Sequence, residues 1–159
     1  MKTLLVVSPH PDDLEIGMGG SVARATELGG RVISAVLTDG RRSPRSFECS
    51  DEEMAEIRKR EAEEAGHVLG IETIFFFGLS DLRSDDNRRQ AGERLIELLG
   101  RYRPEEFYLP HPELDRHESI PDVRPKLQSS VFLETSPFDF SPPLAAIVGT
   151  SSIEAWTCF

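Results

Sequence analysis

The first 110 residues switch repeatedly between two spacings of apolar side chains. Residues Thr3 to Ser8 are nearly all apolar or β-branched, which is typical of a strand buried on both faces of a sheet. From Gly19 to Leu28, small and apolar residues recur at helical spacing, and Gly29-Gly30 then ends the helix. Arg31 to Leu37 is again mainly apolar. These segments predict a strand, a helix and a second strand.

The same alternation continues to a fourth strand. Ser50 and Glu53 form a capping box at the start of a helix that runs to Leu69, and three consecutive phenylalanines mark a buried strand from Ile71 to Phe77. Another helix is expected from Arg88 to Tyr102, and Phe107 begins the fourth strand. The pattern predicts an α/β fold, with a Rossmann-like, doubly wound, mostly parallel sheet and helices on both faces in three αβα layers.

The last part of the chain carries a weaker pattern. Val131 to Leu133 and Ala145 to Val148 fit short strands, and five prolines between Pro121 and Pro143 exclude a long helix. The length of the chain suits a domain with a single hydrophobic core. We therefore expect a single domain over residues 1–159, with its core in 1–120 and an atypical C-terminal segment in 121–159, altered or truncated relative to a full sheet.

The charge balance of the chain limits the kinds of partner that it can bind. The chain has 159 residues, with 18 Lys and Arg against 28 Asp and Glu, and a formal net charge of −10. Uncompensated negative charge repels nucleic-acid backbones and anionic membranes, so we expect neither as a partner. Cys49 and Cys158 are too few for a disulfide scaffold. The opening apolar run is too short for a signal peptide or a membrane span, so we expect a cytoplasmic protein, and a homo-oligomer stays open.

Two groups of metal-capable side chains follow two different predicted strands. His10, Asp12 and Asp13 come directly after the first strand, and a second group from His111 to His117 comes after the fourth. The carboxyl ends of parallel strands share one edge of the sheet, where open α/β folds place their ligand sites. Taken singly, these residues also fit a helix N-cap or a packed histidine. Together they concentrate negative charge that a cation would neutralise.

Residues Gly17 to Gly20 follow a strand, as a nucleotide-binding loop would. Their spacing differs from Gly-x-Gly-x-x-Gly, and the neighbouring Asp12, Asp13 and Glu15 would repel a pyrophosphate. We expect these glycines instead to allow close packing of helix against strand beside a metal site.

Several short motifs occur in order between Met1 and about His117. They are Pro9-His10-Pro11-Asp12-Asp13, Thr38-Asp39-Gly40, Arg58-x-x-Glu61, Gly78-Leu79-Ser80-Asp81 and Asp115-Arg116-His117. With these motifs the chain resembles the PIG-L/LmbE-like family of zinc-dependent N-deacetylases, which act largely on N-acetylglucosamine conjugates.

The resemblance implies a role for each residue of the first motif. It places zinc on His10 and Asp13, and it makes Asp12 the general base that activates water. The chemistry suits an amide hydrolysis that releases acetate and a free amine.

The second motif departs from the family pattern Asp-x-His-x-x-His. Ile120 stands where the third metal ligand is expected, and isoleucine cannot coordinate a metal. We expect His117 to take the place of that ligand or to act as the catalytic acid. His111 as the ligand, or a weak site with two protein ligands only, stays open.

Charged side chains on helix and loops are candidates for substrate binding. Arg58 is one, and Asp39 and Asp81, each on a loop after a strand, fit either contacts to substrate hydroxyls or turn caps. The loop after the second strand adds three arginines that are either solvated charge or a grip for a phosphate or hydroxyl; they are Arg41, Arg42 and Arg45.

Two hypotheses follow. The first is a zinc-dependent hydrolase that deacetylates its small-molecule partner, an N-acetylated amino sugar such as an N-acetylglucosamine conjugate, or a related small amide. The second is a catalytically silent, degenerate relative that keeps the fold and binds a sugar or a protein, suggested by Ile120 and the atypical tail.

Overall fold

Four parallel strands form the centre of the sheet. The computed structural model describes residues 1–110, 146–149 and 155–156. Its first four strands lie in the order β3-β2-β1-β4 and pair in parallel. They are β1 (Thr3–Ser8), β2 (Arg31–Thr38), β3 (Thr73–Leu79) and β4 (Glu106–Pro110). Beyond β4, β5 (Ala146–Gly149) pairs antiparallel with it and β6 (Ala155–Trp156) pairs parallel with its end.

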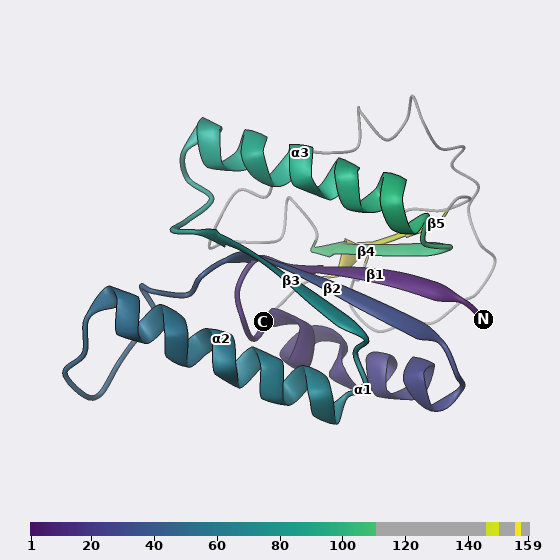
Figure 1. Ribbon diagram of the computed structural model, residues 1–159, viewed down its shortest axis with the longest axis horizontal. Helices are drawn as coiled ribbons and strands as arrows, with labels where there is room; N and C mark the ends of the chain where they lie inside the picture. Colours follow the sequence, from purple (N-terminus) through teal and green to yellow (C-terminus); the bar gives the residue numbers. More distant parts are fainter. Residues whose placement is uncertain (111–145, 150–154, 157–159) are drawn as a thin grey trace.

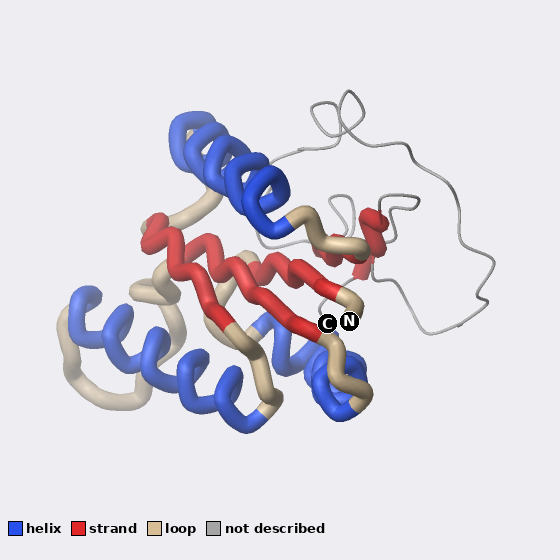
Figure 2. Tube along the Cα trace, turned by 45° about the vertical axis from the view of Figure 1, so that its right-hand side comes forward, coloured by secondary structure: helices blue, strands red, loops and turns tan. Residues whose placement is uncertain are grey.

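Helices cover both faces of this sheet. They are α1 (Asp13–Glu27), α2 (Asp51–Val68) and α3 (Asp85–Tyr102). α1 and α2 lie on one face and α3 on the other, so the molecule has three layers (Figures 1 and 2). The predicted fold class, a doubly wound three-layer α/β fold, is confirmed. No helix in the described part of the chain is long and apolar enough to cross a membrane.

The two faces of β1 bury two separate cores. Leu4 and Val6 pack with Leu14, Met18 and Val22 of α1 on one face. On the other face, the alternate residues of β1 join side chains of α3. This alternation is what a strand covered on both faces requires, and it explains the nearly unbroken apolar run of β1.

α1 begins at Asp13, six residues before the predicted Gly19. Leu14, Met18 and Val22 already follow one another at intervals of four and bury one face of the helix, so the packing extends it toward β1. A Cβ added at Gly19 or Gly20 would meet no atom within 4 Å. The expectation that these glycines allow close packing against the strand is therefore wrong for Gly19 and Gly20.

β3 lies at one edge of the sheet, and the sequence did not indicate this position. It runs from Thr73 to Leu79 rather than from Ile71 to Phe77, and Phe75 and Phe76 are only partly buried. Arg94 of α3 donates from Nη1 to the Phe77 carbonyl at 2.7 Å and lies 4.0 Å from the centre of the Phe77 ring. An edge strand needs such cover because its outer backbone groups have no neighbouring strand.

The predicted bounds of the third helix and of the strand near the C-terminus differ slightly from those in the structure. α3 begins at Asp85, not Arg88, because the Ser84 side chain accepts a hydrogen bond from the Asn87 N–H and caps the helix there. The strand expected at Ala145 to Val148 is present as β5. The strand expected at Val131 to Leu133 lies outside the described residues.

Candidate active site

Asp13 closes the loop between β1 and α1. Its Oδ2 accepts a hydrogen bond of 2.7 Å from the His10 backbone N–H and lies 3.1 Å from His10 Nδ1. The Asp13 side chain is only 12% exposed. Asp12 occupies the N-cap position of α1, but its side chain makes no capping hydrogen bond. The carboxylate of Asp12 is therefore not used to cap α1.

This loop lies where the winding of the sheet reverses. β1 and β4 are neighbours, and the helix after β1 covers one face while the helix before β4 covers the other (Figure 1). In open α/β sheets the crevice at this switch point, at the carboxyl ends of the strands, is the usual ligand site. The second predicted group, which includes His111, His117 and Ile120, follows β4 and lies outside the described residues.

Arg58 joins α2 to this loop. Its Nη2 donates to Asp12 Oδ2 at 2.5 Å, and its Nη1 donates to Glu61 Oε2 one turn further along α2. The Arg58 side chain is 19% exposed, and its Nε is buried with no hydrogen-bond partner in the described part of the chain. The motif Arg58-x-x-Glu61 places these two residues one helical turn apart, but the sequence did not indicate the contact of Arg58 with Asp12.

Gly40 leaves room for the Arg58 side chain. Its φ is +69°, and a Cβ there would lie 3.2 Å from Arg58 Cγ and 3.1 Å from Pro11 Cγ. A glycine suits this position both because of its backbone conformation and because of the close approach. The stem of Arg58 therefore passes beside the turn after β2 on its way to Asp12.

Hydrogen bonds tie the ends of the strands together. Thr38, at the end of β2, donates from both its N–H and its hydroxyl to the Pro9 carbonyl, at 2.9 and 2.8 Å. The Asp39 N–H donates to the Leu79 carbonyl at the end of β3, at 2.9 Å. These bonds connect the loops after β1, β2 and β3 along one edge of the sheet.

Each arginine of the loop after β2 has a carboxylate partner. The pairs are Arg41 Nε with Asp39 Oδ2 at 2.8 Å, Arg42 Nη1 with Asp81 Oδ2 at 3.2 Å, and Arg45 Nη2 with Asp51 Oδ1 at 2.5 Å. The ion pairs leave both interpretations of these arginines open, solvated charge or a grip for an anion, and the Arg42 side chain is 59% exposed. The pair of Arg42 and Asp81 links the loop after β2 to the loop after β3.

The carboxylates of these pairs also accept backbone hydrogen bonds. Asp39 Oδ1 accepts from the Arg41 N–H, and Asp81 Oδ1 accepts from the Arg83 N–H, both at 3.0 Å. Both carboxylates thus do the turn capping that the sequence allowed. The Arg83 N–H, and next Arg42, hold the pKa of Asp81 below its usual value.

Glu15 lies close to Asp12 and Asp13, but the sequence analysis did not assign it to the site. Burial, and to a smaller extent repulsion from Asp12 and Asp13, raise the pKa of its carboxyl above the usual value. Its nearness in sequence to Asp13 was readable, but its place in the first turn of α1 was not, because the helix was predicted to begin at Gly19. Its partial burial was not readable either.

The donor set fits a metal ion only in part. His10 and Asp13 present an imidazole and a carboxylate to one another, and both are common zinc ligands. Within residues 1–110, 146–149 and 155–156, no three His, Cys, Asp or Glu side chains are grouped so that they could hold a metal. A zinc site would therefore need at least one donor from elsewhere, and His117 is the predicted one.

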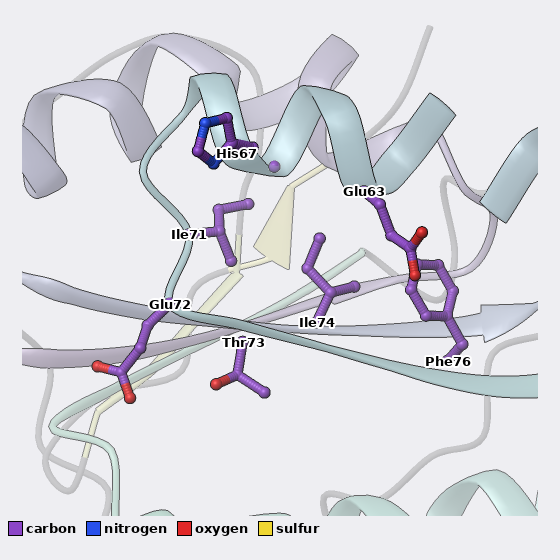
Figure 3. Close-up of a pocket in the computed structure, with 8 residues that line it drawn as sticks. Glu63, His67, Ile71, Glu72, Thr73, Ile74 and Phe76 are labelled. Atoms are coloured by element: carbon purple, nitrogen blue, oxygen red, sulfur yellow. The ribbon is translucent and has the colours of Figure 1, made fainter. Parts of the chain in front are cut away.

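A shallow pocket of about 230 Å³ lies elsewhere, between the second half of α2 and β3. Figure 3 shows Glu72 pointing away from His67, and Arg31 holds the Glu72 carboxylate. The pocket contains none of the predicted site residues. Its lining consists of Glu63, Gly66, His67, Ile71, Glu72, Thr73, Ile74 and Phe76.

The fold and the loop at the switch point together define a class, the Rossmann-like α/β proteins of the LmbE type. Within that class, the chain belongs to the PIG-L family: the model described as "GlcNAc-PI de-N-acetylase" matches residues 5–122. The resemblance seen in the motifs is thus confirmed.

Comparison with individual proteins agrees with this family assignment. The chain is 31% identical over 124 residues to the diacetylchitobiose deacetylase of Thermococcus kodakarensis, covering 78% of this chain and 46% of that protein. The structure resembles the N,N'-diacetylchitobiose deacetylase of Pyrococcus horikoshii with a TM-score of 0.68 and 30% identity, covering 80% of this chain and 48% of that one. The chain therefore spans about half the length of these relatives.

A structural neighbour of another activity is almost as similar. The 4-carboxy-2-hydroxymuconate hydratase GalB of Pseudomonas putida has a TM-score of 0.63 and 27% identity, covering 81% of this chain and 55% of that one. The fold therefore supports more than one chemistry, and the activity of this chain has to be argued from its site.

Proposed function

We propose that this chain carries the catalytic loop of a zinc-dependent hydrolase that removes the acetyl group from an N-acetylated amino sugar. The observation that carries the proposal is the group of His10, Asp12 and Asp13 at the switch point, with Arg58 fixed on Asp12. The relatives named as deacetylases of acetylated chitobiose support this substrate class.

His10 and Asp13 are the residues that would hold zinc, with His117 as the third donor. When bound, zinc supplies Lewis-acid polarisation of the acetamide carbonyl. The hydrogen bond from the His10 N–H to Asp13 orients the carboxylate, so the chain fixes the direction of one ligand before any metal arrives.

Asp12 is the proposed general base. It is 47% exposed, so water can reach it, and Arg58 holds one of its oxygens while the other remains available to accept a proton. His117 is the third zinc donor in this proposal; if another side chain completes the zinc site, His117 is instead the acid that protonates the leaving amine. The products are acetate and the free amino sugar.

Arg58, Asp39 and Asp81 are the proposed substrate contacts. Among the described residues the buried Arg58 Nε–H has no hydrogen-bond partner, and a sugar oxygen is one partner that would satisfy a guanidinium at this position. The carboxylates of Asp39 and Asp81 are engaged by arginines, but each oxygen retains a lone pair for a substrate hydroxyl.

A catalytically silent relative is the second candidate. It is favoured by Ile120, which replaces the expected third ligand, and by the grouping of only two metal donors among the described residues. In that case the fold would serve to bind a sugar or a protein partner.

The test combines zinc content with acetate release from N,N'-diacetylchitobiose. The purified chain, Asp13→Ala and Ile120→His are compared. Stoichiometric zinc and turnover in the parent, both lost in Asp13→Ala, would establish the enzyme. Metal and turnover in Ile120→His alone would establish the silent relative. Zinc binding without acetate release would direct attention to other chemistry, such as that of the hydratase.

A further inference from the structure

The guanidinium of Arg58 lies between two carboxylates from different parts of the chain. Its Nη2 donates to Asp12 Oδ2 at 2.5 Å, and its Nη1 donates to Glu61 Oε2. Asp12 belongs to the loop after β1, whereas Glu61 lies one turn beyond Arg58 on α2. The proposed general base is therefore linked through Arg58 to a side chain of α2.

Arg58 binds Asp12 through one nitrogen only. Arginine and carboxylate groups frequently pair through two parallel hydrogen bonds, because the spacing of the guanidinium nitrogens matches that of the carboxylate oxygens. Here a single bond reaches Oδ2, and no hydrogen bond from the described residues reaches Asp12 Oδ1. The free oxygen is the one that can accept a proton from water in the proposed reaction.

The stem of Arg58 has little freedom to move. The side chain is 19% exposed, and a Cβ at Gly40 would lie 3.2 Å from Arg58 Cγ, so the stem is held beside the turn after β2. The outer bonds of the side chain then set the direction of the guanidinium. That direction depends on the groups that the guanidinium nitrogens meet.

Glu61 occupies a nitrogen that a second bond to Asp12 would need. A two-bond pair through Nη1 and Nη2 would take Nη1 away from Glu61, and one through Nε would turn the guanidinium and break the same contact. Nε is buried and has no hydrogen-bond partner among the described residues. The Glu61 side chain is 54% exposed, and such pairs on a helix surface contribute little to stability, so we look for its effect in the direction of Arg58.

We propose that Glu61 is a positioning residue of the site, which keeps Arg58 from closing on both oxygens of Asp12. When Glu61 is removed, the freed nitrogen of Arg58 donates to Asp12 Oδ1, and the oxygen that should accept a proton becomes engaged. The consequence for catalysis rests on the proposed function, because it takes Asp12 as the general base.

A crystal structure of Glu61→Ala tests the geometry without an assay of activity. Alanine keeps α2 intact because it is the strongest helix former. Arg58 should donate to both oxygens of Asp12 in this variant, and it should keep its single bond in Glu64→Ala, at another exposed position of α2. A guanidinium in Glu61→Ala that keeps its single bond, or that turns away to solvent or to Glu15, the other carboxylate close to its charge, overturns the proposal.

Kinetics test the consequence for the base. On the zinc-loaded chain with N,N'-diacetylchitobiose, Glu61→Ala should lower kcat by about five- to tenfold, a part of what a general base contributes. KM should stay within about twofold, because the guanidinium turns without leaving the site. Glu64→Ala should change neither constant. An unchanged kcat in Glu61→Ala, or a rise in KM alone, would contradict the positioning of the base.

A second background shows whether Glu61 acts through Arg58. A lysine ammonium is a single point of charge and cannot close on two oxygens as the guanidinium fork does. Added to Arg58→Lys, Glu61→Ala should therefore change kcat by less than about twofold. A loss of the same size in both backgrounds would show that Glu61 does not act through Arg58, and it would overturn the proposal.

This proposal and the proposed function fail separately. If the chain releases no acetate from N,N'-diacetylchitobiose, the deacetylase function fails, and the crystal structures still decide whether Glu61 directs Arg58 on Asp12. If the chain is active and Arg58 keeps its single bond in Glu61→Ala, the positioning role fails and the function stands.

Discussion

The guanidinium of Arg58 donates to Asp12 Oδ2 at 2.5 Å, although the two residues are 46 positions apart in sequence. The contact ties α2 to the loop after β1 and fixes the side chain that we propose as the general base. Glu61, on the same helix, holds the second nitrogen of the guanidinium. The base is therefore oriented from α2, not from its own helix.

Replacing Arg58 by lysine tests this arrangement. A single ammonium group cannot donate to Asp12 and Glu61 from two fixed nitrogens, so Arg58→Lys should lower kcat/KM for N,N'-diacetylchitobiose by about 10- to 100-fold, the worth of a hydrogen bond to a charged group. Arg60→Lys, the same change at an exposed position of the same helix, should have no such effect. Equal rates in the two variants would contradict the role of Arg58.

Gly40 should be intolerant of a side chain. Gly40→Ala places a Cβ at φ +69° and within 3.2 Å of both Pro11 and Arg58, so it should destabilise the fold by about 1–2 kcal/mol or more. Gly20→Ala is the control. It lies in α1 with nothing within 4 Å of the new Cβ, and it should stabilise the fold by up to about 1 kcal/mol. Urea denaturation measures both, and a shift of the same sign in the two variants would refute the explanation.

Substitutions at Asp12 and Asp13 should separate catalysis from metal binding. Asp12→Asn removes the proposed base, so turnover should fall by about 10²- to 10⁴-fold while the zinc content is kept. Asp13→Asn should lose zinc and turnover together, because an amide is a poor zinc ligand. The asparagine oxygen can still accept from the His10 N–H, so circular dichroism should show a folded protein in both cases. Loss of zinc in Asp12→Asn would instead show that Asp12 is a metal ligand.

The stability of the loop after β3 should depend on pH through Asp81. The folded protein holds the pKa of this carboxyl below its usual value, by the Arg83 N–H first and Arg42 next. A lowered pKa contributes stability that is present above the unfolded value, about 3.9, and is lost as the pH falls through the folded value. The free energy of unfolding should therefore differ more between the parent and Asp81→Asn near pH 7 than near pH 2.

Arg42→Gln provides the control for that measurement. It removes one of several groups that lower the pKa of Asp81, so the pH dependence of the Asp81 contribution should become weaker but should not disappear. A contribution of Asp81 that is the same near pH 7 and near pH 2 would show that its carboxylate is not favoured in the folded state.

The elements of the fold were predictable because each depends on neighbouring residues. The apolar run of β1 and the capping box of Ser50 and Glu53 are both complete within a few positions. The start of α1 was misplaced because three glycines in its first eight residues weaken a helical pattern that packing against β1 restores. The exposure of β3 was missed because an apolar strand at an edge and one at the centre have the same spacing.

The sequence alone determined the order of strands and helices along the chain, since each element follows from the spacing of side chains a few residues apart. The tertiary structure alone decided which arginine meets which carboxylate across the loops, as in Arg58 with Asp12 and Arg42 with Asp81. The physical reason is the winding of the sheet: the strand order β3-β2-β1-β4 brings loops distant in sequence to one edge. Ion pairs between those loops follow from that order and not from any local pattern.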